Sequence, residues 1–159
     1  MRSICWALAA VMLAGCTVMQ DAPRRLGSCG IALAVFVAHP RDARYEYFRI
    51  DDGVLNYGGG SDALLMKTSW SAPMTREQCD RVLELSRAAG WCDPEAKSRD
   101  GESDAAMASV AVACEGGRVQ FRRPASEATA AAVIAYLDRL ARARLEKYLD
   151  RLPEAGLQR

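Results

Sequence analysis

The chain has 159 residues, of which 50% are hydrophobic and 26% are charged, and its formal net charge is +1. This length suits a single domain built around one hydrophobic core. The near balance of charge argues against a nucleic-acid partner, because binding to phosphates requires a basic patch or stripe.

The N-terminus carries the parts of a secretory signal. Arg2 supplies the positive start, residues 4–13 form the apolar run, and small residues follow it. The run ends in Leu13-Ala14-Gly15-Cys16, which resembles the lipobox of bacterial lipoproteins. The resemblance implies cleavage before Cys16 and lipid attachment to its thiol. The alternatives are an ordinary secreted protein or a membrane-spanning helix, although a span needs about 20 apolar residues. We therefore expect residues 1–15 to be a signal peptide.

The same resemblance implies where the mature chain lies. Its partner would be the membrane, through lipid on Cys16. Thr17 stands where the family uses aspartate for inner-membrane retention, which implies the periplasmic face of the outer membrane. Residues 16–28 predict a lipidated N-terminus and a tether, of which residues 17–28 span at most about 40 Å. The mature chain has 20 basic and 20 acidic side chains, since Arg2 is the only charge removed, and we expect one domain over residues 29–159.

The first half of this domain predicts strands. Residues 31–38 form an apolar run that is typical of a central strand buried on both faces. Residues 45–50 and 54–57 predict a hairpin around an Asp-Asp-Gly turn. The glycine-rich residues 58–62 predict a loop, and residues 64–71 predict a further strand.

The second half predicts two helices and another hairpin. A capping box beginning at Thr75 starts a short helix over residues 75–89, and the polar residues 91–105 predict a surface loop. Residues 109–114 and 118–122 predict a hairpin across a Glu-Gly-Gly turn, and Ser126 caps a long helix that ends near Arg151. Strands followed by helices, without alternation, indicate an α+β fold. We expect an antiparallel sheet with a short central helix and a long C-terminal helix.

Four cysteines remain once Cys5 leaves with the signal peptide and Cys16 carries lipid: Cys29, Cys79, Cys92 and Cys114. An even number in an oxidising compartment predicts two disulfides. Along the predicted helix, Cys79 lies about 16 Å from Gly90, and two further residues recover at most about 7 Å. Bridged Cα atoms lie within about 7 Å, which disfavours a 79–92 bond and, with it, a 29–114 bond. Two pairings remain open: 29–79 with 92–114, or 29–92 with 79–114.

The sequence shows no pattern for a metal, a cofactor or a nucleophilic triad. No two of the four cysteines stand two to four residues apart, and His39 is the only histidine. Gly58-Gly59-Gly60 lacks the following Lys-Ser or Lys-Thr of a phosphate loop. We interpret His39, before a proline at a strand end, as a half-exposed structural residue.

Four aromatic residues fall on the first predicted strands: Tyr45, Tyr47, Tyr57 and Trp70. Strand alternation places Tyr45 and Tyr47 on one face and Phe48 and Ile50 on the other, so a buried second pair predicts an exposed first pair. Exposed Tyr and Trp suit a recognition surface, because they bury a large area and keep a polar tip. The alternative is that Trp70 and at least two of the tyrosines complete the core.

These observations predict a lipid-anchored cell-envelope protein with a small disulfide-stapled domain. We expect the domain to act by binding, with another envelope protein as partner, and not by catalysis. The alternative is a periplasmic hydrolase that uses paired carboxylates near residues 93–104. A third reading is a structural role in organising the envelope.

Overall fold

The computed structural model describes residues 29–101 and 104–149, and the side chains of residues 144, 145 and 147–149 are outside that description. The predicted signal peptide, the predicted lipidation site Cys16 and the predicted tether therefore lie outside the described residues.

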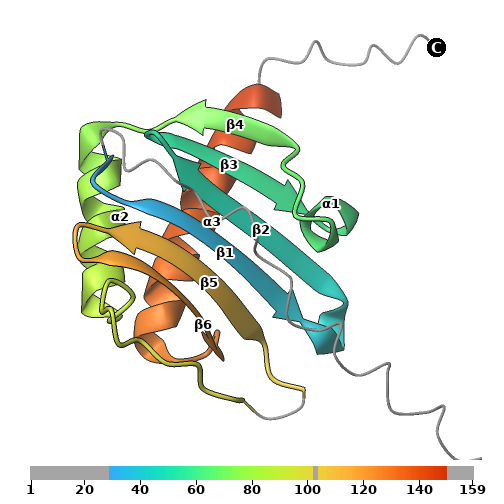
Figure 1. Cartoon of the computed structure of the whole chain (residues 1–159). Coiled ribbons are helices and arrows are strands. Elements are labelled where there is room, and N and C mark those ends of the chain that lie inside the picture. Colours follow the sequence, from blue (N-terminus) through green and yellow to red (C-terminus); the bar gives the residue numbers. More distant parts are fainter. Residues whose placement is uncertain (1–28, 102–103, 150–159) are drawn as a thin grey trace, which may run out of the picture.

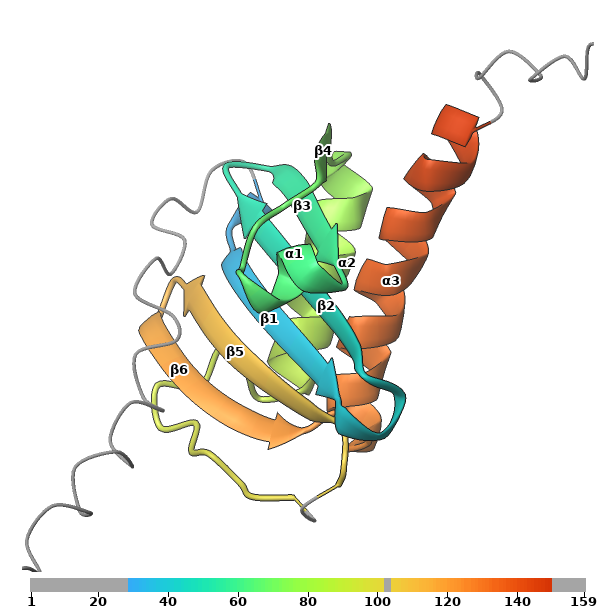
Figure 2. The same ribbon diagram turned by 90° about the vertical axis from the view of Figure 1, so that its right-hand side faces the viewer.

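The domain is α+β, as predicted (Figure 1). Six strands form one antiparallel sheet in the order β4-β3-β2-β1-β5-β6. Helices α2 and α3 lie side by side on one face of this sheet, and the short α1 stands apart from them (Figure 2). The strands are β1 (Ala32–His39), β2 (Arg44–Asp51), β3 (Val54–Gly59), β4 (Trp70–Pro73), β5 (Met107–Cys114) and β6 (Gly117–Pro124), and the helices are α1 (Ser61–Leu64), α2 (Arg76–Ala88) and α3 (Ala128–Leu149).

Strand β1 is central, as its continuous apolar run predicts. It pairs with β2 on one side and β5 on the other. Its helix-facing residues Leu33, Val35 and Val37 are buried in the main core, whereas Ala34 is buried on the opposite face. Burial on both faces explains why this strand shows no apolar and polar alternation.

Both predicted hairpins are present. The β2–β3 turn consists of Asp52 and Gly53, whose φ angles of 51° and 75° place both in the left-handed region. Two such residues are the usual composition of a tight hairpin turn, because that backbone twist matches the twist of the strands. In the second hairpin, Cys114 pairs with Gly117, and Phe121 points into the core as its alternation predicts.

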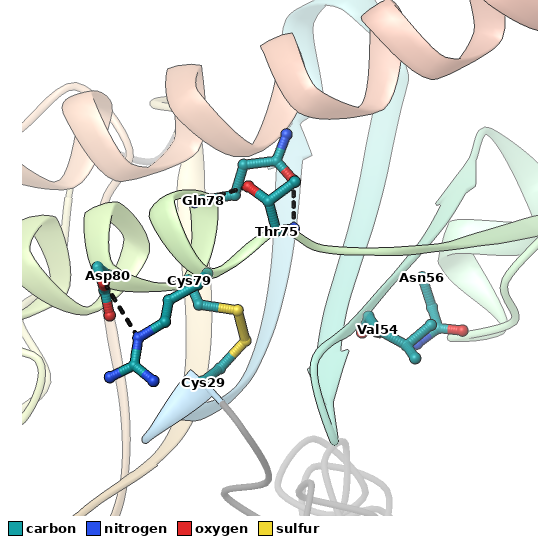
Figure 3. Close-up of a disulfide and its surroundings, with 8 residues drawn as sticks. Cys29, Val54, Asn56, Thr75, Gln78, Cys79 and Asp80 are labelled. Carbon is teal, nitrogen blue, oxygen red and sulfur yellow. Dashed lines mark hydrogen bonds and ion pairs between the residues drawn. A yellow bond between two sulfur atoms is a disulfide. The ribbon is translucent and has the colours of Figure 1, made fainter.

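Helix α2 begins and ends at the signals found in the sequence. The Thr75 hydroxyl accepts a hydrogen bond from the Gln78 N–H, and the Gln78 side chain accepts one from the Thr75 N–H (Figure 3). At the other end, Gly90 has a φ of 67°, and the Trp91 N–H donates to the Ser86 carbonyl. This Schellman geometry directs Trp91 back toward the sheet.

The segment after the first hairpin differs from its prediction. Gly58 and Gly59 continue β3 and α1 begins at Ser61, so the predicted loop over residues 58–62 is wrong at both of its ends. Strand β4 begins only at Trp70, so the predicted strand over residues 64–71 is wrong in its first six residues. The cause is a close approach of two chain segments. A Cβ at Gly58 would overlap the backbone carbonyl of Lys67, so only glycine leaves room for the backbone of the segment that leads to β4.

Two further boundaries differ. Trp91 is fully buried and its ring lies 6.2 Å from that of Phe121, so the predicted surface loop over residues 91–105 is wrong at its first residue. Helix α3 begins at Ala128, two residues after the predicted cap at Ser126, and the Ala131 N–H donates to the carbonyl of Glu127. The predicted end near Arg151 lies outside the described residues.

Candidate functional site

Two disulfides attach α2 to one end of the sheet. Cys29 precedes β1 and bonds to Cys79 in the first turns of α2, with Cα atoms 4.7 Å apart (Figure 3). Cys92 follows α2 and bonds to Cys114 at the end of β5, with Cα atoms 5.7 Å apart. The structure therefore selects the 29–79 and 92–114 pairing from the two that the sequence left open.

The structure divides the four predicted aromatic residues between the two faces of the sheet. Tyr45 and Tyr47 lie on the face opposite the long helices, as alternation predicts, and the Tyr45 ring stacks on Phe36 with centroids 6.3 Å apart. Tyr47, however, is only 5% exposed, so the expectation that both tyrosines are exposed is wrong. It packs with Ala34, Ala63 and Ala111 in a second, smaller cluster of buried side chains. The two tyrosines therefore form no exposed pair.

The other two aromatics lie on the helix side of the sheet. The Tyr57 ring lies 5.2 Å from the ring of Phe48 and 5.9 Å from that of Trp70. Tyr57 and Trp70 are both partly exposed and pack at the margin of the main core. They form an aromatic pair at the β3–β4 edge, separate from Tyr45 and Tyr47.

A buried carboxylate lies close to this aromatic pair. Glu46 on β2 is 6% exposed and is the one charged residue among the buried residues that the structure describes. Its Oε2 lies 3.7 Å from Nε2 of His39, and its Oε1 lies 4.0 Å from Nε of Arg44. Nη2 of Arg44 in turn lies 3.2 Å from His39 Nε2. The Arg44 guanidinium and the Glu46 carboxylate therefore both lie beside the Nε2 atom of the His39 ring.

The Tyr57 side chain extends across Gly59, which is the cross-strand partner of Glu46. Gly59 pairs with Glu46 across β2 and β3, and a Cβ added to Gly59 would lie 3.0 Å from the Tyr57 hydroxyl oxygen. Burial raises the pKa of Tyr57 above its ordinary value, and the negative charges of Glu46 and Asp138 raise it further. Each of these effects disfavours the phenolate, so Tyr57 stays a hydrogen-bond donor at neutral pH.

Helix α3 adds an ion pair to the cluster. Nε of Arg142 donates to both carboxylate oxygens of Asp138, at 2.9 and 2.8 Å. The Asp138 charge raises the pKa of Tyr57, and the Arg142 charge lowers it, so both act on the same hydroxyl from the helix side. We refer to His39, Arg44, Glu46, Tyr57, Asp138 and Arg142 as the Glu46 cluster.

Chemically, the Glu46 cluster combines acid and base groups with a proton donor and an exposed cation. A carboxylate beside an imidazole can hold or transfer a proton, which is what general acid–base catalysis requires. The exposed Arg142, within electrostatic reach of Tyr57, can engage an anionic group. In the described residues, no three metal-ligating side chains gather into a possible metal site.

The remaining predicted candidates are placed as follows. His39 has a 21% exposed side chain, which suits the expected half-exposed residue, although it belongs to the Glu46 cluster. Four carboxylates of the loop predicted for a hydrolase, Asp93, Glu95, Asp100 and Asp104, are exposed, and Glu102 lies outside the described residues. None of these four therefore has the buried environment that keeps a catalytic acid protonated.

Sequence reasoning missed Glu46, although a signal was present. The alternation that turns Phe48 and Ile50 inward also turns Glu46 inward, two residues before Phe48. A glutamate at an inward position of a half-buried strand is a costly choice unless it is paired, which is itself an indication of function.

Comparison with models of known protein families finds no match for this chain, and comparison with curated proteins finds none either. Within residues 29–101 and 104–149, no helix is both long enough and apolar enough to cross a membrane.

Proposed function

We propose that this chain is a lipid-anchored protein of the bacterial cell envelope whose domain acts by binding. The observation that carries the proposal is the pairing of Cys29, Cys79, Cys92 and Cys114. Disulfides persist in oxidising compartments such as the periplasm. With these four bonded, the lipobox residue Cys16 is the one cysteine of the mature chain left for acylation.

The anchor is tested by labelling cells with a radioactive fatty acid. Wild type incorporates the label, whereas Cys16→Ser does not and keeps its signal peptide, because both processing and attachment act through that thiol. Cys5→Ser is the matched control, since Cys5 leaves with the signal peptide and its loss should change nothing. Equal incorporation into wild type and Cys16→Ser would refute the anchor.

The binding surface that the geometry favours is the β3–β4 edge beside α3. Tyr57 and Trp70 offer aromatic faces with polar tips, and exposed Arg142 lies within electrostatic reach of Tyr57. Aromatic residues and arginine are enriched at protein interfaces and carry most of their binding energy. The partner in this proposal is another envelope protein.

A photo-crosslinking amino acid placed at position 142 in the full-length chain tests this surface in intact cells. We expect a crosslink to one envelope protein, lost when Trp70→Ala is added. The same cross-linker at Glu115, whose side chain is 80% exposed in the β5–β6 turn, is the control position and should give no such product. Equal products from both positions would contradict a specific surface.

Acid–base hydrolysis is the second candidate, because two carboxylates act on Tyr57. Glu46 and Asp138 both raise the pKa of that residue, so two carboxylates lie within electrostatic reach of one hydroxyl group. A panel of chromogenic glycosides, esters and phosphoesters tests for turnover. Hydrolysis that is lost in Glu46→Gln and kept in Glu95→Gln would support an enzyme, whereas no turnover by wild type would count against it.

A further inference from the structure

Helix α1 exposes two adjacent leucines. Leu64 is 52% exposed and Leu65, which follows α1, is 64% exposed, and they are the large hydrophobic residues exposed to this degree among the side chains that the structure describes. Single exposed leucines are ordinary on a protein surface, but two in succession on a projecting turn form a small apolar patch.

Hydrogen bonds hold this turn in a fixed shape. The Gly60 N–H donates to the Tyr45 carbonyl at 2.9 Å, which attaches the start of α1 to β2. The Lys67 N–H donates to the Asp62 carbonyl at 2.8 Å, and the Ser69 hydroxyl donates to the Asp62 carboxylate at 2.8 Å. Beneath the turn, Ala63 is fully buried. The leucines are therefore presented outward by a braced structure.

A basic side chain stands next to the two leucines. Lys67 follows the leucines and is exposed, and the acidic side chain of the turn, Asp62, is already engaged by Ser69. The β1–β2 connection adds exposed Arg41 together with exposed Asp42. It lies at the same end of the sheet as α1 (Figure 1).

We propose that α1 docks onto the lipid bilayer, with Leu64 and Leu65 entering its interfacial layer and Lys67 meeting anionic headgroups. The patch consists of two side chains and is far smaller than the roughly 1,200 Å² of a stable protein interface, so a protein partner would gain little from it. A bilayer accepts a small apolar protrusion flanked by basic side chains.

This inference rests on the proposed lipid anchor. An anchor on Cys16 with a tether of at most about 40 Å keeps α1 close to the bilayer, so a contact that is weak in solution becomes effectively intramolecular. Docking through α1 would then fix which side of the domain faces away from the membrane. That side includes α2 and α3, which cover the opposite face of the sheet (Figure 2).

The test uses the processed full chain in vesicles of phosphatidylethanolamine and phosphatidylglycerol that contain a phospholipid with a photoactivatable acyl chain. After illumination, mass spectrometry should find lipid on residues 61–67. Leu64→Ser with Leu65→Ser should lower this labelling at least tenfold. Lys67→Gln should lower it roughly fivefold, and only when phosphatidylglycerol is present. Thr129→Ser with Ala132→Ser, two exposed α3 positions, is the matched control and should leave the labelling unchanged.

Flotation of the vesicles separates the two proposals. A chain that floats with the vesicles but carries no lipid on α1 overturns the docking and leaves the anchor intact. A chain that neither floats nor is labelled overturns both proposals. Unchanged melting temperatures for the leucine double variant and for Lys67→Gln show that any loss of labelling comes from the surface and not from unfolding.

Discussion

Removing each disulfide in turn gives a quantitative test of how the domain is held together. Cys29 and Cys79 are 50 residues apart in sequence, and Cys92 and Cys114 are 22 apart. The chain-entropy relation for these loops predicts losses of about 4.1 and about 3.4 kcal/mol when each pair is replaced by alanine. Either loss is a large part of a total stability of about 5–15 kcal/mol. We therefore expect both variants to be strongly destabilised, the 29–79 variant more so.

Urea denaturation of the purified chain and of the two double-alanine variants measures these losses, and thiol counting on denatured, unreduced protein verifies the bonds. In the wild type we expect neither Cys29, Cys79, Cys92 nor Cys114 to react. A loss below about 1 kcal/mol for either pair would refute the reasoning, as would a larger loss for the shorter loop.

Three further predictions concern individual side chains. Tyr47→Ala should cost about 3–5 kcal/mol in urea denaturation, because Tyr47 is buried, while Tyr45→Ala should cost clearly less; equal losses would contradict the packing. Gly58→Ala should lower the melting temperature by an amount equivalent to about 1–3 kcal/mol, because its Cβ would overlap a backbone carbonyl of the crossing segment, and an unchanged temperature would disprove that approach. Ultraviolet titration should find the pKa of Tyr57 above 10.0 and lowered by Glu46→Gln. The raised pKa means that the folded state favours protonated Tyr57, so the contribution of Tyr57 to stability is complete below about pH 10 and is lost as the pH rises through the raised pKa. An ordinary pKa for Tyr57 would count against the Glu46 cluster.

The elements that local chemistry determines could be predicted from the sequence. The capping box at Thr75, the turn at Asp52 and Gly53 and the apolar run of β1 each act over a few residues, and each is found where it was expected. The disulfides were narrowed to two pairings because helix geometry alone separates Cys79 from Cys92. Choosing between these pairings required knowing how α2 lies across the sheet, which puts Cys79 beside Cys29 and Cys92 beside Cys114 and is a long-range property of the fold.

The parts that were missed depend on contacts between distant segments. Alternation shows that Tyr47 and Phe48 face opposite ways, but not that Tyr47 is buried in a second cluster of side chains. The roles of Gly58 and Trp91 depend likewise on what packs against them, which is Lys67 in one case and the main core in the other. The inward direction of the Glu46 side chain could be predicted, but its surroundings could not, because the other residues of the Glu46 cluster come from β1, β3 and α3 as well as from β2 itself.

The position of the first disulfide has a mechanical consequence. In the proposed protein, the tether enters the domain at Cys29, shortly before the central strand β1 begins at Ala32. Tension from a membrane that moves relative to a bound partner would arrive at this point. The Cys29–Cys79 bond passes that tension into α2, and the Cys92–Cys114 bond passes it on to β5. The tension is thus shared by β1, α2 and β5 through covalent bonds. In a reduced domain the noncovalent contacts of β1 would bear the tension, and β1 would be the first strand to detach from the sheet.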